Sequence, residues 1–167
     1  MKLADPLVSE LEYEAATTRR VLDRIPDSEF GWKPHPKSFS LGELASHTAN
    51  IADWAAITLT TDELNLDPVD SKPWLASTRA ELLEQFDRNL AKSLSLLREA
   101  DDEHLRAPWT LKSMGQTVLT LPRSAVLRTW VLNHMIHHRG QLAVYLRLRD
   151  IPVPSIYGPS ADEQPAR

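Results

Sequence analysis

Apolar residues recur three or four positions apart in four segments of the chain, which is the spacing of amphipathic helices. Asp5 before Pro6 has the pattern of an N-cap followed by a first helical residue, and Pro26 predicts the end of this first helix. Ser40 and Glu43 have the spacing of a capping box. The second helix is therefore expected to begin there and to run to about residue 60.

Two more helices are expected in the second half of the chain. Thr78 and Glu81 repeat the capping-box pattern at the start of the third helix, after a linker over residues 61–76 that contains two prolines. The fourth helix is expected from near Pro122 to just before Pro152.

The segment between the third and fourth helices, residues 101–121, lacks a clear helical pattern. Apolar and polar residues alternate around Leu111 and again around Val118, and Gly115 lies between these two runs. This alternation permits a short β-hairpin.

Four helices of about 20 residues, each about 30 Å long, have the dimensions of one helical bundle. The long linker between the second and third helices suggests a crossover connection in place of a simple hairpin turn. We therefore expect an all-α fold, a four-helix bundle with a crossover, in a single domain over residues 1–167. Residues 155–167 are rich in Pro, Ser and acidic side chains and are expected to form a surface tail.

Composition is typical of a globular protein rather than a disordered one, with 42% hydrophobic and 25% charged residues among 167. The formal net charge of -4 argues against generic binding to nucleic acid or to an acidic membrane surface. No apolar run approaches the roughly 20 residues that span a bilayer. The first residues lead into an amphipathic helix without a signal-peptide pattern, so a cytoplasmic protein is expected.

The chain contains no cysteine, which restricts its chemistry. No disulfide can form, and a metal ion could be held only by His, Asp or Glu side chains. Such ligands are typical of a partly open, catalytic type of site rather than a closed structural one. If thiol chemistry takes place here, the thiol arrives with a substrate.

Three of the six histidines, His134, His137 and His138, lie within five residues of the fourth predicted helix. His134 and His138 are four residues apart, so both project from nearly the same face and could share one divalent ion. Both occupy positions of the apolar stripe where leucine would be expected, and His47 takes a similar position in the second helix. Three imidazoles at core positions are unfavourable unless something satisfies their polar atoms.

Less specific interpretations of these histidines remain open. A single histidine on an apolar face more often forms a hydrogen bond in the core than it binds a metal, and pairs four residues apart also occur on helix surfaces by chance. His137 is rotated by about 60° from His134 and could face a neighbour, a group behind the ligands, or solvent. His35 and His104 lie in polar segments and are expected to be solvated.

A few other side chains are weaker candidates for the same site. Glu43 lies one turn before the histidine of the second helix, although its capping role already explains it. Trp54 could line a pocket, and Asn50 and Asp53 could orient a ligand from behind. Arg139 is expected to be a surface or interface charge rather than a catalytic group.

Three sequence motifs resemble the DinB/YfiT-like family. The first is SLGELASH, from Ser40 to His47, at the start of the second helix. The second is HMIHHRGQL, from His134 to Leu142, and the third is the tail PVPSIYGPSADE, from Pro152 to Glu163. The similarity covers nearly the whole chain, and the spacing between the two histidine motifs fits.

The resemblance implies a four-helix bundle, usually a homodimer, in which one histidine of the second helix and an HxxxH pair of the fourth bind a divalent metal. On this chain the implied ligands are His47, His134 and His138. Imidazole nitrogens suit Zn, Ni and Fe alike, so the metal stays open. The family includes members that use low-molecular-weight thiols and many of no known activity.

The expected function is that of a metal-dependent enzyme acting on a small molecule. The ion would leave a position open to water or to a substrate thiol and would lower the pKa of either. No inward carboxylate accompanies the HxxxH pair, which argues against peptidase chemistry. Thiol transfer is favoured over hydrolysis mainly by the resemblance, and no catalytic residue beyond the ligands is assigned.

Two alternatives to an enzyme stay open. The chain could be a non-catalytic, stress-associated metal-binding or interaction protein, in which the same three histidines stabilise the bundle. The histidines could also form a metal-free hydrogen-bonded network in the core.

Overall fold

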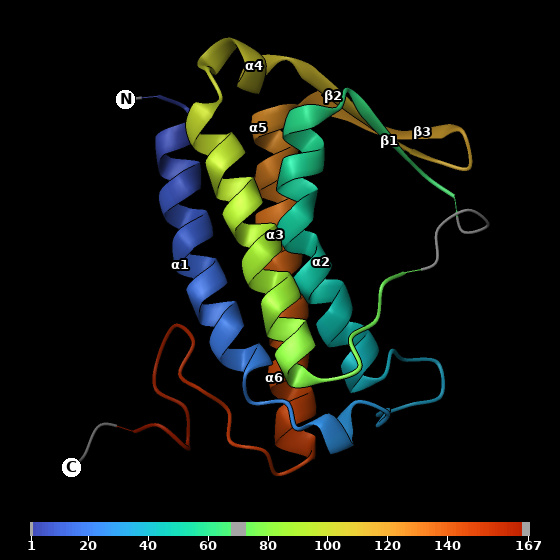
Figure 1. The fold of residues 1–167 in the computed structure, drawn as a ribbon, viewed down its shortest axis with the longest axis vertical. Helices are drawn as coiled ribbons and strands as arrows, with labels where there is room; N and C mark the ends of the chain where they lie inside the picture. Colours follow the sequence, from blue (N-terminus) through green and yellow to red (C-terminus); the bar gives the residue numbers. More distant parts are fainter. Residues whose placement is uncertain (1, 68–72, 165–167) are drawn as a thin grey trace.

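Four long helical segments make up most of the structure, a computed structural model that describes residues 2–67 and 73–164 (Figure 1). They are α1 (Ala4–Leu22), α2 (Leu41–Thr60), α3 (Arg79–Glu99) and a last segment made of α5 (Arg123–Val126), η2 (Leu127–Asn133) and α6 (His134–Leu148). Helices α1 and α2 each pack against both α3 and α6. The predicted all-α four-helix bundle is therefore confirmed, with a small sheet added at one end.

Helices α2 and α3 run in the same direction, which confirms the predicted crossover between them (Figure 1). The Asn89 side chain donates a hydrogen bond to the Ala49 carbonyl at 3.1 Å, and the Ser93 hydroxyl donates to the Ala52 carbonyl at 2.5 Å. The partner positions advance together along the two helices, as parallel helices require. The connection therefore returns along the full length of the bundle before α3 begins.

Of the two capping boxes predicted from the sequence, one is formed completely and the other only half. The capping box of α2 is complete: Ser40 Oγ accepts from the Glu43 backbone N–H at 3.1 Å, and Glu43 Oε2 accepts from the Ser40 N–H at 2.6 Å. At α3, Thr78 Oγ1 accepts from the Glu81 N–H at 3.2 Å, but the Glu81 carboxylate accepts from Ser77 instead. This second box is therefore only half formed.

The predicted ends of the first helix are wrong by a few residues. Helix α1 begins at Ala4, so Asp5 lies in its first turn rather than at the N-cap. There its carboxylate accepts from the Lys2 backbone N–H at 2.8 Å and faces the positive end of the helix dipole. The helix already ends at Leu22, and Pro26 instead precedes a short 3₁₀ turn, η1 (Asp27–Glu29).

The linker predicted over residues 61–76 is not structureless, because it contains strand β1 (Glu63–Leu66). The part of the predicted linker that covers residues 68–72, including Pro68, lies outside the described residues. Strand β1 pairs in parallel with β2 (Pro108–Ser113), which pairs antiparallel with β3 (Gln116–Pro122). Sequence periodicity could not reveal β1, because a four-residue strand carries too short a pattern.

The permitted hairpin exists and is formed by β2 and β3, after the short helix α4 (Asp102–Arg106). Its turn uses Met114 at φ 49° and Gly115 at φ 76°. Glycine is favoured at the second of these positions because a side chain strains that backbone conformation.

Arg123 fastens the sheet to the bundle at the start of the last helical segment. It is 3% exposed and donates hydrogen bonds to the carbonyls of Thr58, Pro108 and Thr61, at 3.0, 3.2 and 2.8 Å. It also pairs with Asp62 at 2.6 Å. The helix that carries two of the clustered histidines is thereby fixed at its beginning.

Arg139 is buried, so the prediction of a surface or interface charge is wrong. Its guanidinium is 1% exposed and lies 2.6 Å from the Glu14 carboxylate of α1. The Tyr157 hydroxyl completes the group, accepting from Arg139 at 2.6 Å and donating to Glu14 at 2.8 Å. The sequence pattern missed this because a charge is buried only when its partner, here 125 residues away, meets it in space.

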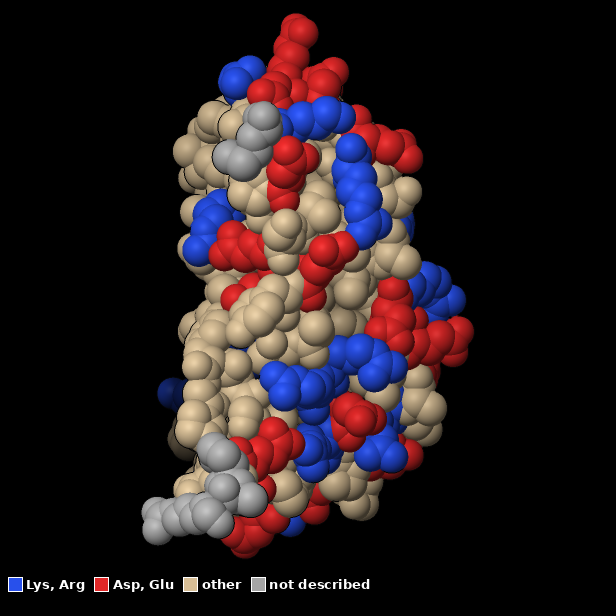
Figure 2. All heavy atoms as spheres, turned by 90° about the vertical axis from the view of Figure 1, so that its left-hand side faces the viewer, with Lys and Arg blue, Asp and Glu red and all other residues tan. Residues whose placement is uncertain are grey.

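Residues 155–164 lie on the surface of the bundle, while 165–167 are outside the described residues. Asp162 pairs with Arg147 at 2.5 Å, and Glu163 with Arg24 at 2.5 Å. On the face seen in Figure 2, acidic and basic side chains are interspersed in this way. Within residues 2–67 and 73–164, no helix is both long and apolar enough to cross a membrane.

Candidate metal centre

Three imidazoles from two helices meet at one point in the bundle. His47 lies on α2, while His134 and His138 occupy successive turns of α6. The Nε2 atoms of His134 and His138 are 2.8 Å apart, and those of His47 and His134 are 3.4 Å apart. One nitrogen from each ring lies within 4.8 Å of the other two, so the group could hold a metal ion.

A π-helical segment, η2 over Leu127–Asn133, comes directly before His134. Its hydrogen bonds run to residue i+5 instead of i+4, so each turn contains more residues than an α-helical turn. Trp130 and His134, which are four residues apart across this segment, therefore lie more nearly above one another than they would in an α-helix. Such segments are frequent at functional sites, and the sequence pattern did not indicate this one.

Gln141 orients His138 from one turn farther along α6. The Gln141 Oε1 atom accepts a hydrogen bond from His138 Nδ1 at 2.7 Å, so the ring proton lies on Nδ1. The Nε2 lone pair is then free to point at the other two rings. A hydrogen bond of this kind is what ligand histidines use to hold their tautomer. Sequence reasoning missed the role of Gln141, although it belongs to the second histidine motif.

The hydrogen-bonding needs of His134 fit a bound cation. If its Nε2 carried a proton and donated it to His138, its Nδ1 would be a bare acceptor, and this buried atom has no hydrogen-bond partner of good geometry among the described residues. If all three Nε2 lone pairs face a cation, the proton moves to Nδ1, on the side of the Trp130 carbonyl. The donor set is thus compatible with a bound transition-metal ion.

Burial keeps these rings uncharged at neutral pH. Loss of water contact, with a smaller contribution from the neighbouring His138, lowers the pKa of His47 to about 4. Burial likewise lowers the pKa of His134 to about 4, with His138 and His47 adding to the effect. For His138, burial lowers the pKa while the Gln141 hydrogen bond opposes this. Neutral imidazoles offer lone pairs to a metal without first losing a proton.

Aromatic side chains of α2, of η2 and of the segment before α2 lie around the histidine cluster. The centroid of the Trp54 ring lies 6.0 Å from that of His47 and 5.3 Å from that of His134, and both contacts are edge-on. Phe39 lies 6.1 Å from His47, and Trp130 lies 6.0 Å from His134. Trp54 therefore flanks the histidine cluster and, as predicted, lines a pocket, the small cavity that it shares with Trp130.

The other predicted candidates do not reach the cluster. Glu43 is engaged by its cap and by Lys33 at 3.1 Å. Asp53 pairs with Lys92 at 2.8 Å. Within the described residues, the hydrogen bonds of the three clustered rings do not involve Asn50.

The remaining histidines lie apart from the cluster or at its edge. His137 is exposed, with its ring 4.8 Å from that of His138. His35 is exposed, as expected. His104 is half-buried and donates from Nε2 to the Leu59 carbonyl at 2.9 Å, so the expectation that it is solvated is wrong.

Comparison with known protein families identifies the chain. The model of the DinB superfamily matches residues 10–142, which include all three clustered histidines. The chain belongs to the DinB superfamily. It is also 28% identical over 163 residues to the uncharacterized protein YrdA of Bacillus subtilis (strain 168), covering 95% of this chain and 90% of YrdA.

Two solved structures have the same fold as this DinB protein. A DinB-like protein from Bacillus cereus ATCC 10987 superposes with a TM-score of 0.72 at 20% identity, covering 90% of this chain and 95% of that one. The DinB-like protein YjoA from Bacillus subtilis superposes with a TM-score of 0.68 at 19% identity, covering 96% of this chain and 100% of YjoA. Together with the family match, the three-histidine cluster is compatible with metal binding.

An open pocket of about 440 Å³ gives access to the cluster. It is lined by residues of η2 and the first turns of α6, namely Thr129, Trp130, Asn133, His134, His137 and His138. A small molecule seated there would lie against two of the three converging rings. The arrangement therefore combines a set of neutral nitrogen donors with room for a ligand.

Proposed function

We propose that this DinB protein is a metal-dependent enzyme in which His47, His134 and His138 hold one divalent transition ion, such as Zn, Ni or Fe. The observation that carries the proposal is the meeting of one ring nitrogen from each of the three histidines within 4.8 Å, beside an open pocket. A bound ion of this kind supplies Lewis acidity, which lowers the pKa of a coordinated thiol or water. The reaction would take place in one domain that spans residues 1–167.

The surroundings of the cluster favour a thiol over water as the nucleophile. Among the described residues that line the pocket there is no carboxylate that could take a proton from water. A free thiol ionises near pH 8.5, whereas bulk water has a pKa of about 15.7. A thiol therefore needs less assistance to become a nucleophile at neutral pH.

The reaction that fits best is transfer of a low-molecular-weight thiol to a small electrophile. The sulfur forms a bond to an electrophilic carbon, the leaving group departs with its electron pair, and the thiol proton passes to solvent. The chain contributes orientation: Gln141 holds the His138 ring, and Trp54 keeps water from the α2 side. The thiol comes from the substrate because the chain has no cysteine.

Metal analysis of the purified protein tests this proposal first. We expect one equivalent of transition metal per chain in the wild type, before or after reconstitution with Zn, Ni or Fe, and none in the His47→Ala/His134→Ala variant. His35→Ala is the matched control, since it removes an exposed histidine outside the cluster and should leave the metal content unchanged. Wild type that takes up no metal even after reconstitution would refute the proposal.

Activity then separates an enzyme from the alternative of a non-catalytic metal-binding protein. Metal-loaded wild type should accelerate the reaction of a small thiol with an electrophile such as an alkyl halide, and His134→Ala should abolish the acceleration while remaining folded. A variant that loses thermal stability, from a wild type that accelerates nothing, would favour a structural metal. Acceleration of ester hydrolysis without a thiol would favour the metal-dependent hydrolase.

The expectations of a homodimer and a cytoplasmic location stay predictions. Analytical ultracentrifugation of the wild-type chain measures the first, and fractionation of cells that produce it measures the second. Neither result changes the assignment of the three ligands, which all lie on one chain.

A further inference from the structure

Charged side chains are absent from the described residues that line the pocket beside the histidine cluster. Two arginines lie next to the lining residues in sequence, but both pair with carboxylates of α1. Arg128 lies 3.1 Å from Glu10, and Arg139 lies 2.6 Å from Glu14. A charged group of a ligand that lies against Trp130, away from the ion held by the histidines, would therefore find no charged side chain of opposite sign among the described lining residues.

Trp130 supplies the apolar wall of the pocket. Its indole is half-buried, stands nearly perpendicular to the His134 ring at 6.0 Å, and stacks on Trp54 at 6.3 Å with an angle of 27° between the planes. An indole in this position can stack with another flat apolar group within reach of the histidines.

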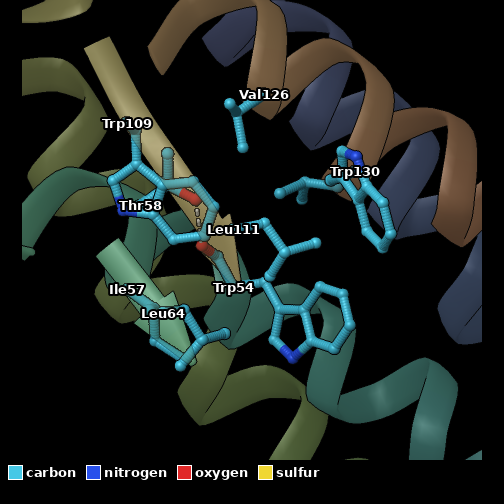
Figure 3. A pocket seen from close by; sticks show the side chains of 9 residues that line it. Trp54, Ile57, Thr58, Leu64, Trp109, Leu111, Val126 and Trp130 are labelled. Atoms are coloured by element: carbon cyan, nitrogen blue, oxygen red, sulfur yellow. Dashed lines mark hydrogen bonds between the residues drawn. The ribbon is translucent and has the colours of Figure 1, made fainter. Parts of the chain in front are cut away.

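The Trp130 side chain is held from behind by a small apolar core. It lines a second cavity, of only about 10 Å³, whose walls include Trp109, Leu111 and Val126. Figure 3 shows the indoles of Trp54 and Trp130 on the side of this cavity opposite Trp109. A void of this size holds at most one water, so the indole has little space to turn inward. The wall is therefore already in position before a ligand arrives.

Besides its histidines, the pocket has two polar side chains, Thr129 and Asn133, which carry no charge and differ in availability. The Thr129 hydroxyl already donates to the Ala125 carbonyl at 2.7 Å. Asn133 is exposed, and its amide forms no hydrogen bond within the described part of the chain. It can therefore donate to or accept from a neutral polar group of a ligand.

We infer that the substrate of this site presents a flat, uncharged, apolar group to Trp130, and that Trp130 determines specificity for it. The inference rests on the proposed function, because it names the class of substrate for the same site. The reactive end of such a molecule would lie against His134 and His138, and its flat group would stack on the indole. Thiols or electrophiles that carry a charge on the flat group would be poor ligands.

Calorimetric titration of zinc-loaded protein with three thiols tests this. Benzyl mercaptan carries a flat neutral ring, 4-(mercaptomethyl)benzoate adds a carboxylate to the same ring, and 2-mercaptoethanol has no ring. We expect benzyl mercaptan to bind about tenfold more tightly than either of the others. In Trp130→Ala, benzyl mercaptan should lose about tenfold in affinity and 2-mercaptoethanol less than twofold, whereas Trp130→Phe should restore most of the loss.

Trp32→Ala is the matched control, since it removes an indole that packs on Tyr145 and Arg149, outside the pocket. It should leave all three affinities unchanged. Equal losses for benzyl mercaptan and 2-mercaptoethanol in Trp130→Ala, or equal wild-type affinities for benzyl mercaptan and the benzoate, would overturn the inference. If Trp130→Ala fails to fold, Trp130→Leu and the wild-type comparison still decide.

The experiment also separates this inference from the proposed function. Metal content is measured in each sample, and failure of wild type to bind Zn, Ni or Fe would refute the proposed function alone. The metal-free protein is then titrated with benzyl alcohol, which has the ring but no thiol, by ligand-observed NMR. Binding that Trp130→Ala removes and Trp32→Ala retains would still support a flat neutral ligand, while its absence would overturn the inference.

Discussion

Burial of the histidine cluster predicts that the metal-free protein loses stability as the pH falls from about 6.5 to about 4. Burial lowers the pKa of both His47 and His134 from 6.5 to about 4. Between these two values the unfolded chain binds protons that the folded protein excludes. The free energy of unfolding therefore keeps its full value above pH 6.5 and declines until the folded rings also become protonated.

The size of the effect follows from the displacement of the pKa. A fall from 6.5 to about 4 corresponds to about 3 kcal/mol for a ring fully removed from water. Both rings are only half-buried, so solvent screening reduces this to about half. We expect the two rings together to lower the free energy of unfolding by about 3 kcal/mol as the pH falls from about 6.5 to about 4.

Urea unfolding at pH 7 and at pH 4, with a chelator present, measures this contribution. Between pH 7 and pH 4, the free energy of unfolding of wild type should fall by about 3 kcal/mol more than that of the His47→Leu/His134→Leu variant. This variant keeps apolar side chains on the apolar stripes of both helices. Comparing the two proteins removes the effect of carboxylates that titrate in both. His35→Leu should behave like wild type, because that ring is exposed. Parallel losses in wild type and the double variant would show that burial of these rings is not the cause.

Three further substitutions probe the supports of the site. Gln141→Ala removes the acceptor of His138 Nδ1 and should weaken metal binding by about 10- to 100-fold in a chelator competition, with unchanged far-ultraviolet circular dichroism; unchanged affinity would exclude an orienting role. Arg139→Met leaves the buried Glu14 carboxylate unpaired and should lower the free energy of unfolding at pH 7 by about 3–5 kcal/mol in urea; a loss below about 1 kcal/mol would contradict this. Tyr157→Phe removes the hydroxyl between these two groups and should lower that free energy by about 1–2 kcal/mol. Tyr13→Phe, at an exposed ring, should change it by less than about 0.5 kcal/mol, and equal effects would refute a special role for Tyr157.

Local sequence patterns predicted the bundle because helix periods and caps are read within one segment. The Ser40 capping box and the crossover after α2 were both confirmed. Strand β1 and the π-helical segment were both missed, because the pattern of apolar and polar residues encodes neither. The strand depends on a partner distant in sequence, and the π-helical segment depends on a hydrogen-bond register. Strand β1, for example, exists only because β2, about 45 residues later, pairs with it.

The histidine cluster was foreseen because polar rings interrupt otherwise apolar stripes on two helices. That signal says only that His47, His134 and His138 turn inward, and the distances between them needed the structure. The roles of Gln141 and Trp130 could not be read in this way. A glutamine or a tryptophan fits its helix pattern equally well whether or not a histidine lies beside it, so neither breaks a local rule.

The two faces of α6 explain how an open site can stay in place. His138 and the next residue, Arg139, point about 100° apart around the helix. One face carries the histidines beside the pocket, and the other carries an arginine locked to Glu14 of α1 at 2.6 Å. A helix held by a buried ion pair on one face can expose neutral donors on the other without shifting. The buried arginine and the clustered histidines are therefore parts of one arrangement, in which α1 supports the helix whose neighbouring face lines the pocket.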